Sequence, residues 1–420
     1  MTGTNVLDEL EWRGLIAQTT DLEQLREQLD TPTTVYCGFD PTAPSLHFGN
    51  LVQLVVLRLF QRYGHHVITL VGGSTGLIGD PRPSSERILK TKEQTAEWVE
   101  RLRRQMTPFL DFEGANPARM VNNLDWTEGI SALDFLRDYG KYFRVNQMIK
   151  KDAVAARLNS SEGISYTEFS YQILQALDYL HLFRDYDCRL QTGGNDQWGN
   201  LTAGTDLVGR AEGESVHALT TPILTDAAGE KFGKSAGNAI WLDPSMTSPY
   251  AFYQYWLNVE DASVIKLLKV FGDRDREQMR QLEQAVETEP FRRAAQRALA
   301  EDATTLVHGS KATQDVKAAS AALFGNSSLV DLDVQTLLDA TSELPSADAA
   351  VGDQVVDVLV ATGLADSRNA ARRTIGEGGA SLNNVKITDA EATLGEADFL
   401  GGRVALLKRG RKNLAAVRLA

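Results

Sequence analysis

The chain has 420 residues, of which 43% are hydrophobic, 24% charged and 8% aromatic. That composition excludes an intrinsically disordered chain and a fibrous repeat, and the length predicts two to three domains at about 150 residues each. Two cysteines, Cys37 and Cys188, are too few for a disulfide framework, and the six histidines are scattered rather than clustered with cysteine at zinc-ligand spacing. We therefore expect a reduced protein without a metal site.

The net charge of -13 is unevenly distributed along the chain. Residues 351–420 carry 10 Lys and Arg against 8 Asp and Glu, whereas residues 1–350 carry 33 against 48. The asymmetry predicts a separate basic module, although by itself so small an excess is more typical of a solvated surface. Residues 1–12 are acidic and polar, and the most apolar run, 51–60, contains polar residues. Neither a secretory signal nor a membrane span is expected, which favours a soluble cytoplasmic protein.

Short apolar runs alternate with longer amphipathic runs from about residue 33, which is the pattern of a parallel sheet with crossover helices. The predicted elements are a strand at 34–39, a helix at 49–63 and strands at 66–71 and 188–192. Two of the strands are followed by glycine pairs, Gly72-Gly73 and Gly193-Gly194, where a ligand can approach the backbone closely. The first half of the chain is therefore predicted to have an α/β fold.

The long interval between the last two of these strands is predicted to be a helical insertion. Residues 88–182 have a mostly helical pattern with a short strand at 119–122, and part of the insertion is expected to face a partner subunit. Residues 261–324 are rich in Ala, Glu, Gln, Arg and Leu at helical spacing, which predicts a small helical domain. A polar stretch at 343–353 is typical of a linker.

A strand, a tight turn and the start of a helix are predicted within residues 36–50. Polar groups follow the strand here, and the carboxyl end of a strand is where open α/β sheets bind ligands. His47 stands at the predicted helix start, where exposed N–H groups and the helix dipole attract phosphate, and Gly49 lets a nucleotide lie close to the backbone. Taken alone, His47 is more typical of a helix cap than of a catalytic group.

A second segment, 229–235, places Lys231 and Lys234 around a glycine. Two ammonium groups in a polar loop suit a pyrophosphate whose charge grows during a reaction. The segment is not a P-loop, because that pattern needs four residues between its glycines and this segment has three. No G-x-G-x-x-G follows a strand either, so a dehydrogenase-like dinucleotide fold has no support. Without its context, the segment is an ordinary basic surface turn.

Together the two segments resemble the signatures of class I aminoacyl-tRNA synthetases. His47-Phe48-Gly49-Asn50 corresponds to the HIGH signature and Lys231-Phe232-Gly233-Lys234-Ser235 to the KMSKS signature. Further segments resemble the bacterial tyrosyl-tRNA synthetase family, and the resemblance covers nearly the whole chain. These segments are Tyr36 to Thr42, Gly76 to Pro81, Phe169-Ser170-Tyr171 with Gln175 and Asp178, and Gly193 to Asn200.

The resemblance implies a pocket for the amino acid tyrosine. Its phenol would be held by Tyr36 and Asp178, and its ammonium group by Asp80, Tyr171 and Gln175. A buried hydroxyl needs hydrogen-bond partners and a carboxylate offsets a desolvated ammonium group, so these residue types suit these roles. Tyr171 and Asp178 are seven apart in an amphipathic run and could be helix surface. Gln175 between them at helical spacing favours a shared, inward-facing wall.

For ATP, the resemblance implies contacts from both signatures. The residues implied to bind ATP are Cys37, Gly38, Asp40, Gly49, Asn50, Asp196 and Lys234, with Asp196 on the ribose. The residues implied to act in catalysis are Thr42, His47, Arg87, Gln197, Lys231 and Lys234. Thr42 and His47 would lie on the γ-phosphate side and Gln197 near the reacting carboxylate. The basic side chains would bind the leaving pyrophosphate in the transition state, so their loss would slow the chemistry more than it weakens ground-state binding.

The implied reaction needs no activated nucleophile of the protein. The carboxylate of tyrosine attacks the α-phosphorus of ATP, and the terminal ribose of tRNA(Tyr) then takes the tyrosyl group. Mg²⁺ is implied by the triphosphate rather than by a ligand cluster, and no tightly bound cofactor is expected. The chain departs from the usual first signature at Phe48 and Asn50 and lacks a loop lysine that many relatives carry. Whether Arg82 replaces that lysine is open.

The tail, residues 355–418, resembles the alpha-L motif of small ribosomal-protein-type RNA-binding folds. Helices are predicted near 357–361 and 367–377, followed by short strands. Clustered basic groups on an acidic protein are what RNA phosphates require, although a basic loop is the alternative. In relatives this domain holds the variable arm of tyrosine tRNA. The predicted tRNA contacts are Arg368, Arg372, Arg373, Lys408, Arg409, Arg411 and Lys412.

The activity implied is the ligation of tyrosine to tRNA(Tyr) by a homodimer without membrane contact. We expect a Rossmann-like α/β catalytic domain with its dimer-forming insertion at 1–225, the signature loop and an anticodon-side helical domain at 226–342, a linker at 343–352 and an α+β RNA-binding domain at 353–420. A tryptophan ligase or a small-molecule adenylyltransferase is the alternative enzyme, against which Tyr36 with Asp178 argues. An inactive RNA-binding or regulatory protein is the alternative of another class, which the intact signature residues disfavour.

Overall fold

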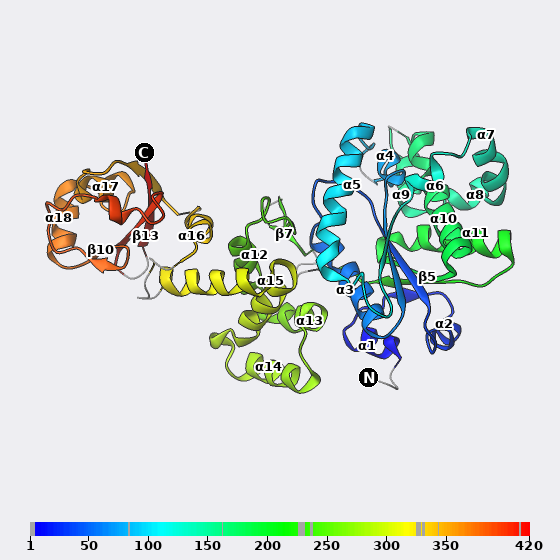
Figure 1. The fold of residues 1–420 in the computed structure, drawn as a ribbon, viewed down its shortest axis with the longest axis horizontal. Coiled ribbons are helices and arrows are strands. Elements are labelled where there is room, and N and C mark those ends of the chain that lie inside the picture. Colours follow the sequence, from blue (N-terminus) through cyan, green and yellow to red (C-terminus); the bar gives the residue numbers. More distant parts are fainter. Residues whose placement is uncertain are drawn as a thin grey trace. The chain divides into compact units, whose positions relative to one another are not determined.

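The computed structural model describes residues 5–82, 85–161, 163–225, 232–235, 238–324, 329, 332–342, 344–410 and 413–420. The chain forms two compact units, the first made of Met1–Met246 with Val259–Leu299 and the second of Thr247–Asn258 with Ala300–Ala420. The first unit contains a large, mostly parallel sheet and the second a smaller one (Figure 1). None of the helices within these ranges is long and apolar enough to cross a membrane.

The sheet of the first unit has six strands in the order β1-β6-β5-β2-β3-β4. They are β1 (Gln18–Thr19), β2 (Thr34–Phe39), β3 (His66–Val71), β4 (Arg119–Asn122), β5 (Cys188–Gly194) and β6 (His217–Thr221). All neighbours pair in parallel except β1, which runs antiparallel to β6. The chain moves from β2 outward through β3 and β4 and then returns to the other side of β2. The strand order therefore reverses between β2 and β5, which is where open α/β sheets bind ligands.

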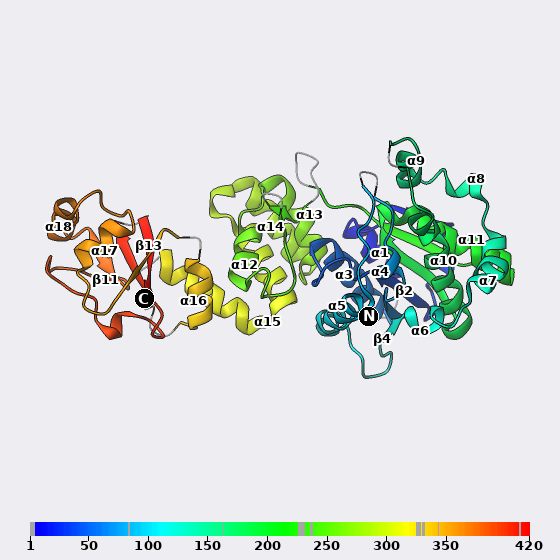
Figure 2. The same ribbon diagram turned by 90° about the horizontal axis from the view of Figure 1, so that it is seen from above.

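Helices cover both faces of this sheet (Figures 1 and 2). On one face lie α3 (Phe48–Arg62) and α5 (Lys92–Met106), and on the other lie α10 (Tyr166–Tyr186) and α11 (Trp198–Glu212). Tyr36 of β2, Tyr179 of α10 and Leu207 of α11 belong to one buried apolar cluster between the second pair of helices and the sheet. α10 ends at Asp187, which adopts a left-handed conformation with φ of 48° and so stops the helix.

Most of the predicted elements of this sheet are confirmed. The strands expected at 34–39, 66–71 and 119–122 have the same bounds in the structure. The strand expected at 188–192 continues through Gly194, and the helix expected at 49–63 lies at Phe48–Arg62. Sequence patterns did not predict β1 or β6. β6 is buried along its whole length but is His-Ala-Leu-Thr-Thr, which is too polar to stand out as an apolar run.

The remaining elements of the first unit are mostly short helices. Between β3 and β5 they are α4 (Thr75–Ile78), η1 (Thr107–Phe109), α6 (Leu124–Thr127), α7 (Ala132–Asp134), η2 (Phe135–Tyr139), η3 (Gly140–Tyr142), α8 (Val145–Met148) and α9 (Asp152–Leu158). Elsewhere they are α1 (Val6–Trp12), α2 (Leu22–Gln28), η4 (Asn195–Gln197), β7 (Lys234–Ser235), β8 (Asn238–Ala239), α13 (Asp261–Phe271), α14 (Arg276–Thr288) and η5 (Pro290–Arg292). The helical pattern expected for the insertion is confirmed, but much of it consists of single turns.

The second unit contains a five-stranded sheet of order β11-β10-β12-β13-β9. Its strands are β9 (Ser346–Ala349), β10 (Ala380–Leu382), β11 (Val385–Lys386), β12 (Val404–Arg409) and β13 (Asn413–Leu419). Its helices are α12 (Pro249–Leu257), α16 (Val334–Thr341), α17 (Val355–Ala361), α18 (Arg368–Gly376) and η6 (Glu396–Asp398), and α15 spans Ala294–Phe324. The two helices predicted in the tail are confirmed as α17 and α18. Leu359, Ile375, Leu407 and Val417 belong to the apolar core that joins these helices to the sheet.

The stretch expected to be a linker contains a strand. Ser346–Ala349 form β9, which pairs in parallel with β13 and places Ala347 opposite Val417. β9 is an edge strand in which Ala349 alone of the four residues is buried. An edge strand needs few apolar side chains, so the polar composition of β9 did not identify it as a strand. These four residues belong to the small sheet rather than to a connection.

Candidate active site

The candidate site lies at the carboxyl ends of four parallel strands. β2 is followed by Asp40, β3 by Gly72, β4 by Asn123 and β5 by the turn η4. Parallel strands bring these ends to one edge of the sheet, so segments far apart in the sequence meet there. A Cβ at Gly72 would lie 1.9 Å from Oδ1 of Asp40. Glycine is therefore required after β3 if the Asp40 carboxylate is to turn into the site.

Asp178 of α10 and Tyr36 of β2 are deeply buried in the site, at 2% and 1% exposure. The carboxylate of Asp178 accepts hydrogen bonds from Nδ2 of Asn123 at 2.9 Å and from Nε1 of Trp126 at 3.0 Å. Burial raises the pKa of Asp178 to about 8, because lost hydration outweighs these two donors. The hydroxyl of Tyr36 has no hydrogen-bond partner within the described residues, and burial raises its pKa. Because both donors to the carboxylate are neutral, this part of the site suits a neutral hydroxyl.

A chain of hydrogen bonds links Asp178 to Asp40. Asn123 donates through Nδ2 to Asp178 and, at 2.9 Å, to Oγ1 of Thr75. Thr75 in turn donates to Oδ1 of Asp40 at 2.6 Å, and the hydroxyl of Tyr171 donates to Oδ2 of Asp40 at 2.8 Å. Burial raises the pKa of Asp40, and both hydroxyl donors oppose that shift. One network therefore holds two buried carboxyl groups, so a change at one alters the donors available to the other.

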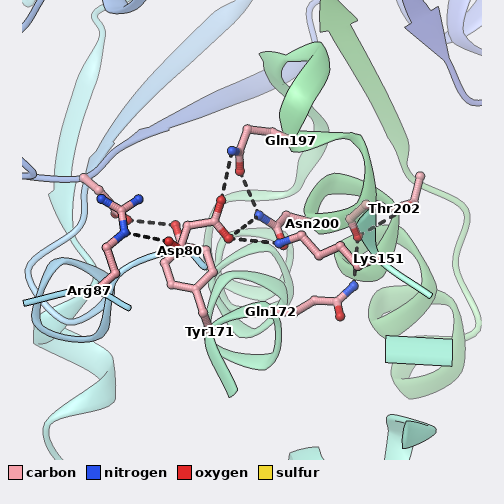
Figure 3. Close-up of polar contacts among 10 residues, drawn as sticks. Asp80, Arg87, Lys151, Tyr171, Gln172, Gln197, Asn200 and Thr202 are labelled. Atoms are coloured by element: carbon pink, nitrogen blue, oxygen red, sulfur yellow. Dashed lines mark hydrogen bonds and ion pairs between the residues drawn. The ribbon is translucent and has the colours of Figure 1, made fainter. Parts of the chain in front are cut away.

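Asp80, which comes after α4, collects nitrogen donors from three directions (Figure 3). Its Oδ1 accepts from Nζ of Lys151 at 2.9 Å and from Nδ2 of Asn200 at 3.3 Å. Its Oδ2 accepts from Nε2 of Gln197 at 3.1 Å. Lys151 and Asp80 are 10% and 19% exposed, so this ion pair is largely shielded from water. This part of the site suits a positive charge.

Tyr171, Gln175 and Asp178 line the wall between these two carboxylates. Spacings of four and three place them on one face of α10, and Tyr171 and Asp178 are buried. Oε1 of Gln175 is buried and has no hydrogen-bond partner within the described residues. The alternative that these residues lie on the helix surface is therefore wrong, and the wall offers an acceptor that a donor group could use.

The loop after Asp80 is tied to α9 and α10. Arg87 donates through Nε to the carbonyl oxygen of Asp80 at 2.7 Å and through its backbone N–H to Oε1 of Glu168 at 2.9 Å. Glu168 is paired with Arg157 at 3.1 Å, and both side chains are almost fully buried. Arg157 also donates to the carbonyl oxygen of Arg82 at 3.4 Å. This buried ion pair positions the loop that carries both Asp80 and Arg87.

His47 forms the N-cap of α3. Its Nδ1 accepts from the N–H of Gly49 at 3.0 Å, and Oδ1 of Asn50 accepts from the N–H of His47 at 3.0 Å, which completes a capping box. Because Nδ1 accepts, a neutral His47 ring carries its proton on Nε2. A Cβ at Gly49 would lie 2.9 Å from the ring, so this cap needs glycine there. Asn50 thus has a structural role in capping α3.

The loop of the second signature packs against the start of α3. The ring centroids of Phe232 and Phe48 are 5.6 Å apart. Gly233, with φ of 86°, approaches so closely that a Cβ there would lie 2.7 Å from Cβ of Phe48. The N–H of Ile240 donates to the carbonyl of Gly233 at 2.9 Å, and the N–H of Phe48 donates to the carbonyl of Ile240 at 3.1 Å. The two signatures are therefore joined by backbone hydrogen bonds and by the ring at position 48.

The other residues expected to bind ATP differ in their exposure to solvent. Cys37 is buried in β2, and burial raises its pKa to about 12, so the thiol stays protonated at neutral pH. The exposed residues at the strand ends are Gly38, Thr42 and Asp196. Lys231 lies outside the described residues, and Lys234 belongs to β7, which pairs with β8. Within the described ranges, no group of three or more His, Cys, Asp or Glu side chains is placed to hold a metal ion.

The predicted RNA-binding arginines of α18 have acidic neighbours. Arg368 pairs with Asp357 at 2.9 Å and Arg372 with Glu391 at 3.2 Å, whereas Arg373 is exposed. These ion pairs lie on the surface, where such pairs contribute little to stability and can be exchanged for other partners.

Two of the other residues predicted to contact tRNA, Lys408 and Arg409, lie at the end of a strand. Lys408 and Arg409 are neighbours in β12, so their side chains point to opposite faces of the sheet. Lys408 is 7% exposed, and loss of hydration lowers its pKa. Arg409 is exposed and donates to the carbonyl of Leu364 at 2.8 Å. Arg411 and Lys412 lie outside the described residues.

Sequence reasoning missed three residues that hold the two carboxylates. Asn123 and Trp126 follow β4 directly, so the rule that ligand-binding residues follow parallel strands could have found them. Lys151 lies between α8 and α9, 71 residues from Asp80, where no periodic pattern marks it. That contact becomes visible only in the folded chain.

Comparison with known proteins agrees with this fold. The family model of tRNA synthetases class I (W and Y) matches residues 28–325, and the model of the tyrosine--tRNA ligase SYY-like C-terminal domain matches residues 336–417. The chain belongs to the class I tRNA synthetases of this group. Within that class its similarity is to the tyrosine--tRNA ligases.

The relatives support this grouping over the full length. The chain is 59% identical over 416 residues to the tyrosine--tRNA ligase of Streptomyces avermitilis and 58% identical over 418 residues to that of Streptomyces coelicolor, covering 99% of each chain in both pairs. The solved structure of a C-terminally truncated mitochondrial tyrosyl-tRNA synthetase from Aspergillus nidulans matches with a TM-score of 0.69 and 28% identity, covering 77% of this chain and 95% of that one.

Proposed function

We propose that the chain ligates tyrosine to tRNA(Tyr) in two steps. In the first, a carboxylate oxygen of tyrosine attacks the α-phosphorus of ATP, the bond to the bridging oxygen of the β-phosphate breaks, and pyrophosphate leaves. In the second, a ribose hydroxyl of the terminal adenosine of the tRNA attacks the carbonyl carbon of tyrosyl-adenylate. AMP leaves with the former carboxylate oxygen, and the hydroxyl proton is released. The protein contributes alignment and charge stabilisation.

The observation that carries this proposal is the buried pair Tyr36 and Asp178. A phenol hydroxyl between them would donate to the carboxylate of Asp178 and accept from Tyr36, so three polar groups that are costly to bury unpaired would all be satisfied. Phenylalanine would leave Tyr36 and Asp178 without that partner. The indole N–H of tryptophan can donate to Asp178 but offers no acceptor to Tyr36. The pocket chemistry therefore favours tyrosine over both.

The other end of the amino acid would be held at Asp80. Its α-ammonium group would bind this carboxylate, with Tyr171 and Gln175 beside it. Gln197, 3.1 Å from Asp80, would then lie near the carboxylate that reacts. Because the phenol and ammonium ends are recognised by different residues, tyrosine is oriented with its carboxylate toward the nucleotide.

ATP would bind along the start of α3 and the strand ends, entering as its Mg²⁺ complex. Since Nδ1 of His47 caps the helix, Nε2–H would be the ring donor for a phosphate oxygen. Asp196, exposed after β5, would bind the ribose. Further contacts would come from Cys37, Gly38, Asp40, Thr42, Gly49 and Asn50. The leaving pyrophosphate would be stabilised by Arg87, Lys231 and Lys234.

The tRNA would be held in part by the small sheet of the second unit. Arg373 and Arg409 are exposed there, and Arg368 and Arg372 could exchange their surface ion pairs for phosphates. Arg411 and Lys412 are expected to add to this surface, while the burial of Lys408 makes it a weaker candidate. As a tRNA ligase, the protein would act in the cytoplasm.

We infer a homodimer from the insertion. Leu133, Leu136, Val145 and Ile149 are 78%, 51%, 63% and 38% exposed on α7, η2 and the α8 region. Four large apolar side chains exposed in one segment are typical of a protein interface. Sedimentation equilibrium distinguishes a dimer, at twice the mass of one chain, from a monomer.

Amino-acid-dependent exchange of pyrophosphate into ATP tests the function. The assay is run with tyrosine, phenylalanine and tryptophan side by side, followed by charging of tRNA(Tyr). Exchange with tyrosine alone, with charging, is the expected result. Exchange with tryptophan or independent of any amino acid would contradict the tyrosine assignment, and no exchange with any of them would favour an RNA-binding or regulatory protein.

A further inference from the structure

Asp80, the carboxylate expected to hold the ammonium group of the amino acid, already binds an ammonium group of the chain (Figure 3). Nζ of Lys151 lies 2.9 Å from Oδ1 of Asp80, 2.7 Å from Oδ1 of Asn200 and 6.0 Å from the ring centroid of Tyr171. A lysine ammonium and an amino-acid ammonium have the same charge and the same three donors. Lys151 therefore already occupies the carboxylate that the ammonium group of tyrosine would bind.

We propose that Lys151 is an internal competitor for the ammonium group of the substrate. It holds Asp80 before tyrosine binds, and it leaves that carboxylate when tyrosine arrives. The inference rests on the proposed function. Two ammonium groups at a single carboxylate in a shielded site would repel each other, so they cannot both stay. Binding thus exchanges one ion pair for another, and the net affinity for tyrosine is lower than the new contact alone would provide.

The fold of the insertion holds Lys151 at Asp80, and a hollow beside it has room for the displaced side chain. Lys151 lies directly before α9, which is anchored by the buried pair of Arg157 with Glu168 at 3.1 Å. The side chain also lines a hollow of about 450 Å³. The walls of that hollow include Gln172 and Asp206, and the carboxylate of Asp206 is paired with Arg210 at 3.5 Å.

The exchange makes binding depend on the positive charge of the ligand. Tyrosine and tyramine both bring an ammonium group that replaces that of Lys151 at Asp80. The deaminated analogue 3-(4-hydroxyphenyl)propanoate has the phenol and the carboxylate but no ammonium group, so Lys151 stays in place when it binds. Removing the charge of Lys151 should therefore strengthen binding of the first two ligands and not of the third.

The test is calorimetric titration of the full chain with these three ligands. Lys151→Gln removes the charge and keeps a hydrogen-bond donor, and Lys151→Met is measured beside it in case one variant fails to fold. Lys150→Gln is the matched control, because Lys150 is an exposed neighbour with the same charge. Lys151→Arg retains the cation. We expect tyrosine and tyramine to bind about fivefold more tightly to the Gln and Met variants, as for a partly exposed ion pair. The control and Lys151→Arg should match the original chain.

Two results would overturn the inference. Unchanged or weaker tyrosine and tyramine binding in a folded Lys151→Gln or Lys151→Met chain would make Lys151 part of the binding surface. An equal increase in the affinity for all three ligands would indicate that the substitution alters the site in general rather than removes a competitor. If the original chain binds no tyrosine, the proposed function fails instead, so the two failures are distinguishable.

Discussion

Asp178 and Asp80 lie at the same edge of one sheet, yet they accept hydrogen bonds from different kinds of donor. Asp178 is buried, and it accepts from the neutral amide of Asn123 and the neutral indole of Trp126. Asp80 is partly exposed and accepts from the ammonium group of Lys151 in addition to the neutral amides of Asn200 and Gln197. Burial raises the pKa of Asp178 to about 8. The neighbours of a carboxylate, more than its identity, therefore decide whether it suits a hydroxyl or a cation.

Under the proposed function, this difference would orient the substrate. Tyrosine carries a neutral hydroxyl at one end and a cation at the other, and each end would have its own carboxylate. If tyrosine bound in the reverse orientation, its cation would lie beside Asp178 and its phenol at Asp80. Burial favours the neutral form of Asp178, which does not attract a cation. The cation would thus be disfavoured at Asp178, which selects one orientation over the other.

Removing part of the second unit should leave both ends of the pocket unchanged. A chain ending at Leu344 lacks all five strands of the small sheet. Tyrosine-dependent pyrophosphate exchange should persist, while the rate of tRNA(Tyr) charging should fall about a thousandfold, as expected when several phosphate contacts are lost together. Arg373→Glu in the full chain should give a smaller loss. Undiminished charging by the shortened chain would remove the RNA-binding role of the tail.

Asp178→Ala should abolish recognition at the phenol end alone. A buried hydroxyl that loses its partner costs about 2 to 3 kcal/mol, so tyrosine should bind about a hundredfold more weakly. ATP binding should remain measurable by equilibrium dialysis. Asp185→Ala is the control, because Asp185 is an exposed carboxylate on the same helix. Unchanged tyrosine affinity would contradict the role given to Asp178.

The raised pKa of Asp178 predicts a pH dependence of stability. An Asp in the unfolded chain titrates near pH 3.9, whereas Asp178 in the folded chain titrates near pH 8. Between these two pH values Asp178 is protonated in the folded chain, whereas an Asp in the unfolded chain is ionised. The contribution of Asp178 to the free energy of unfolding is therefore present at low pH and is lost as the pH rises toward 8. Relative to Asp178→Asn, the free energy of unfolding should fall by about 2 kcal/mol from pH 6 to pH 8. Denaturant unfolding followed by intrinsic fluorescence measures it, and parallel curves would contradict the prediction.

Gly233→Ala should disturb neither carboxylate but should slow activation. The new Cβ would meet Phe48 at 2.7 Å, and φ of 86° is strained for alanine. We expect kcat for pyrophosphate exchange to fall about tenfold with little change in tyrosine affinity. Gly213→Ala is a matched control, because its φ is similar, 75°, and nothing lies within 4 Å of its Cβ. Equal effects of the two changes would point to backbone strain rather than to contact with α3.

Local patterns predicted those features whose partners are near in the sequence. The capping position of His47 follows from its place before an apolar helix, and Asn50, three residues later, completes the cap. The strand at 66–71 was recognisable because four of its six residues are apolar and buried. The spacing of Tyr171, Gln175 and Asp178 predicted a shared face that their burial confirms.

Features that depend on distant partners escaped prediction. Lys151 meets Asp80 across 71 residues, and its own segment has no pattern that marks it as a contact. Lys408 belongs to a basic run, yet it is buried because both faces of β12 are covered as far as this residue. β9 looked like a connection because an edge strand can be polar when its partner supplies the hydrogen bonds. In each case tertiary contacts decided the outcome.

The pairing of β9 with β13 has a consequence for the order of synthesis. A ribosome makes Ser346–Ala349 first and Asn413–Leu419 only after both helices and the other strands of the small sheet. During that interval β9 has no strand beside it, because its neighbour in the sheet does not yet exist. β9 can therefore join the small sheet only after β13 has been made, which sets a late step in the folding of this unit.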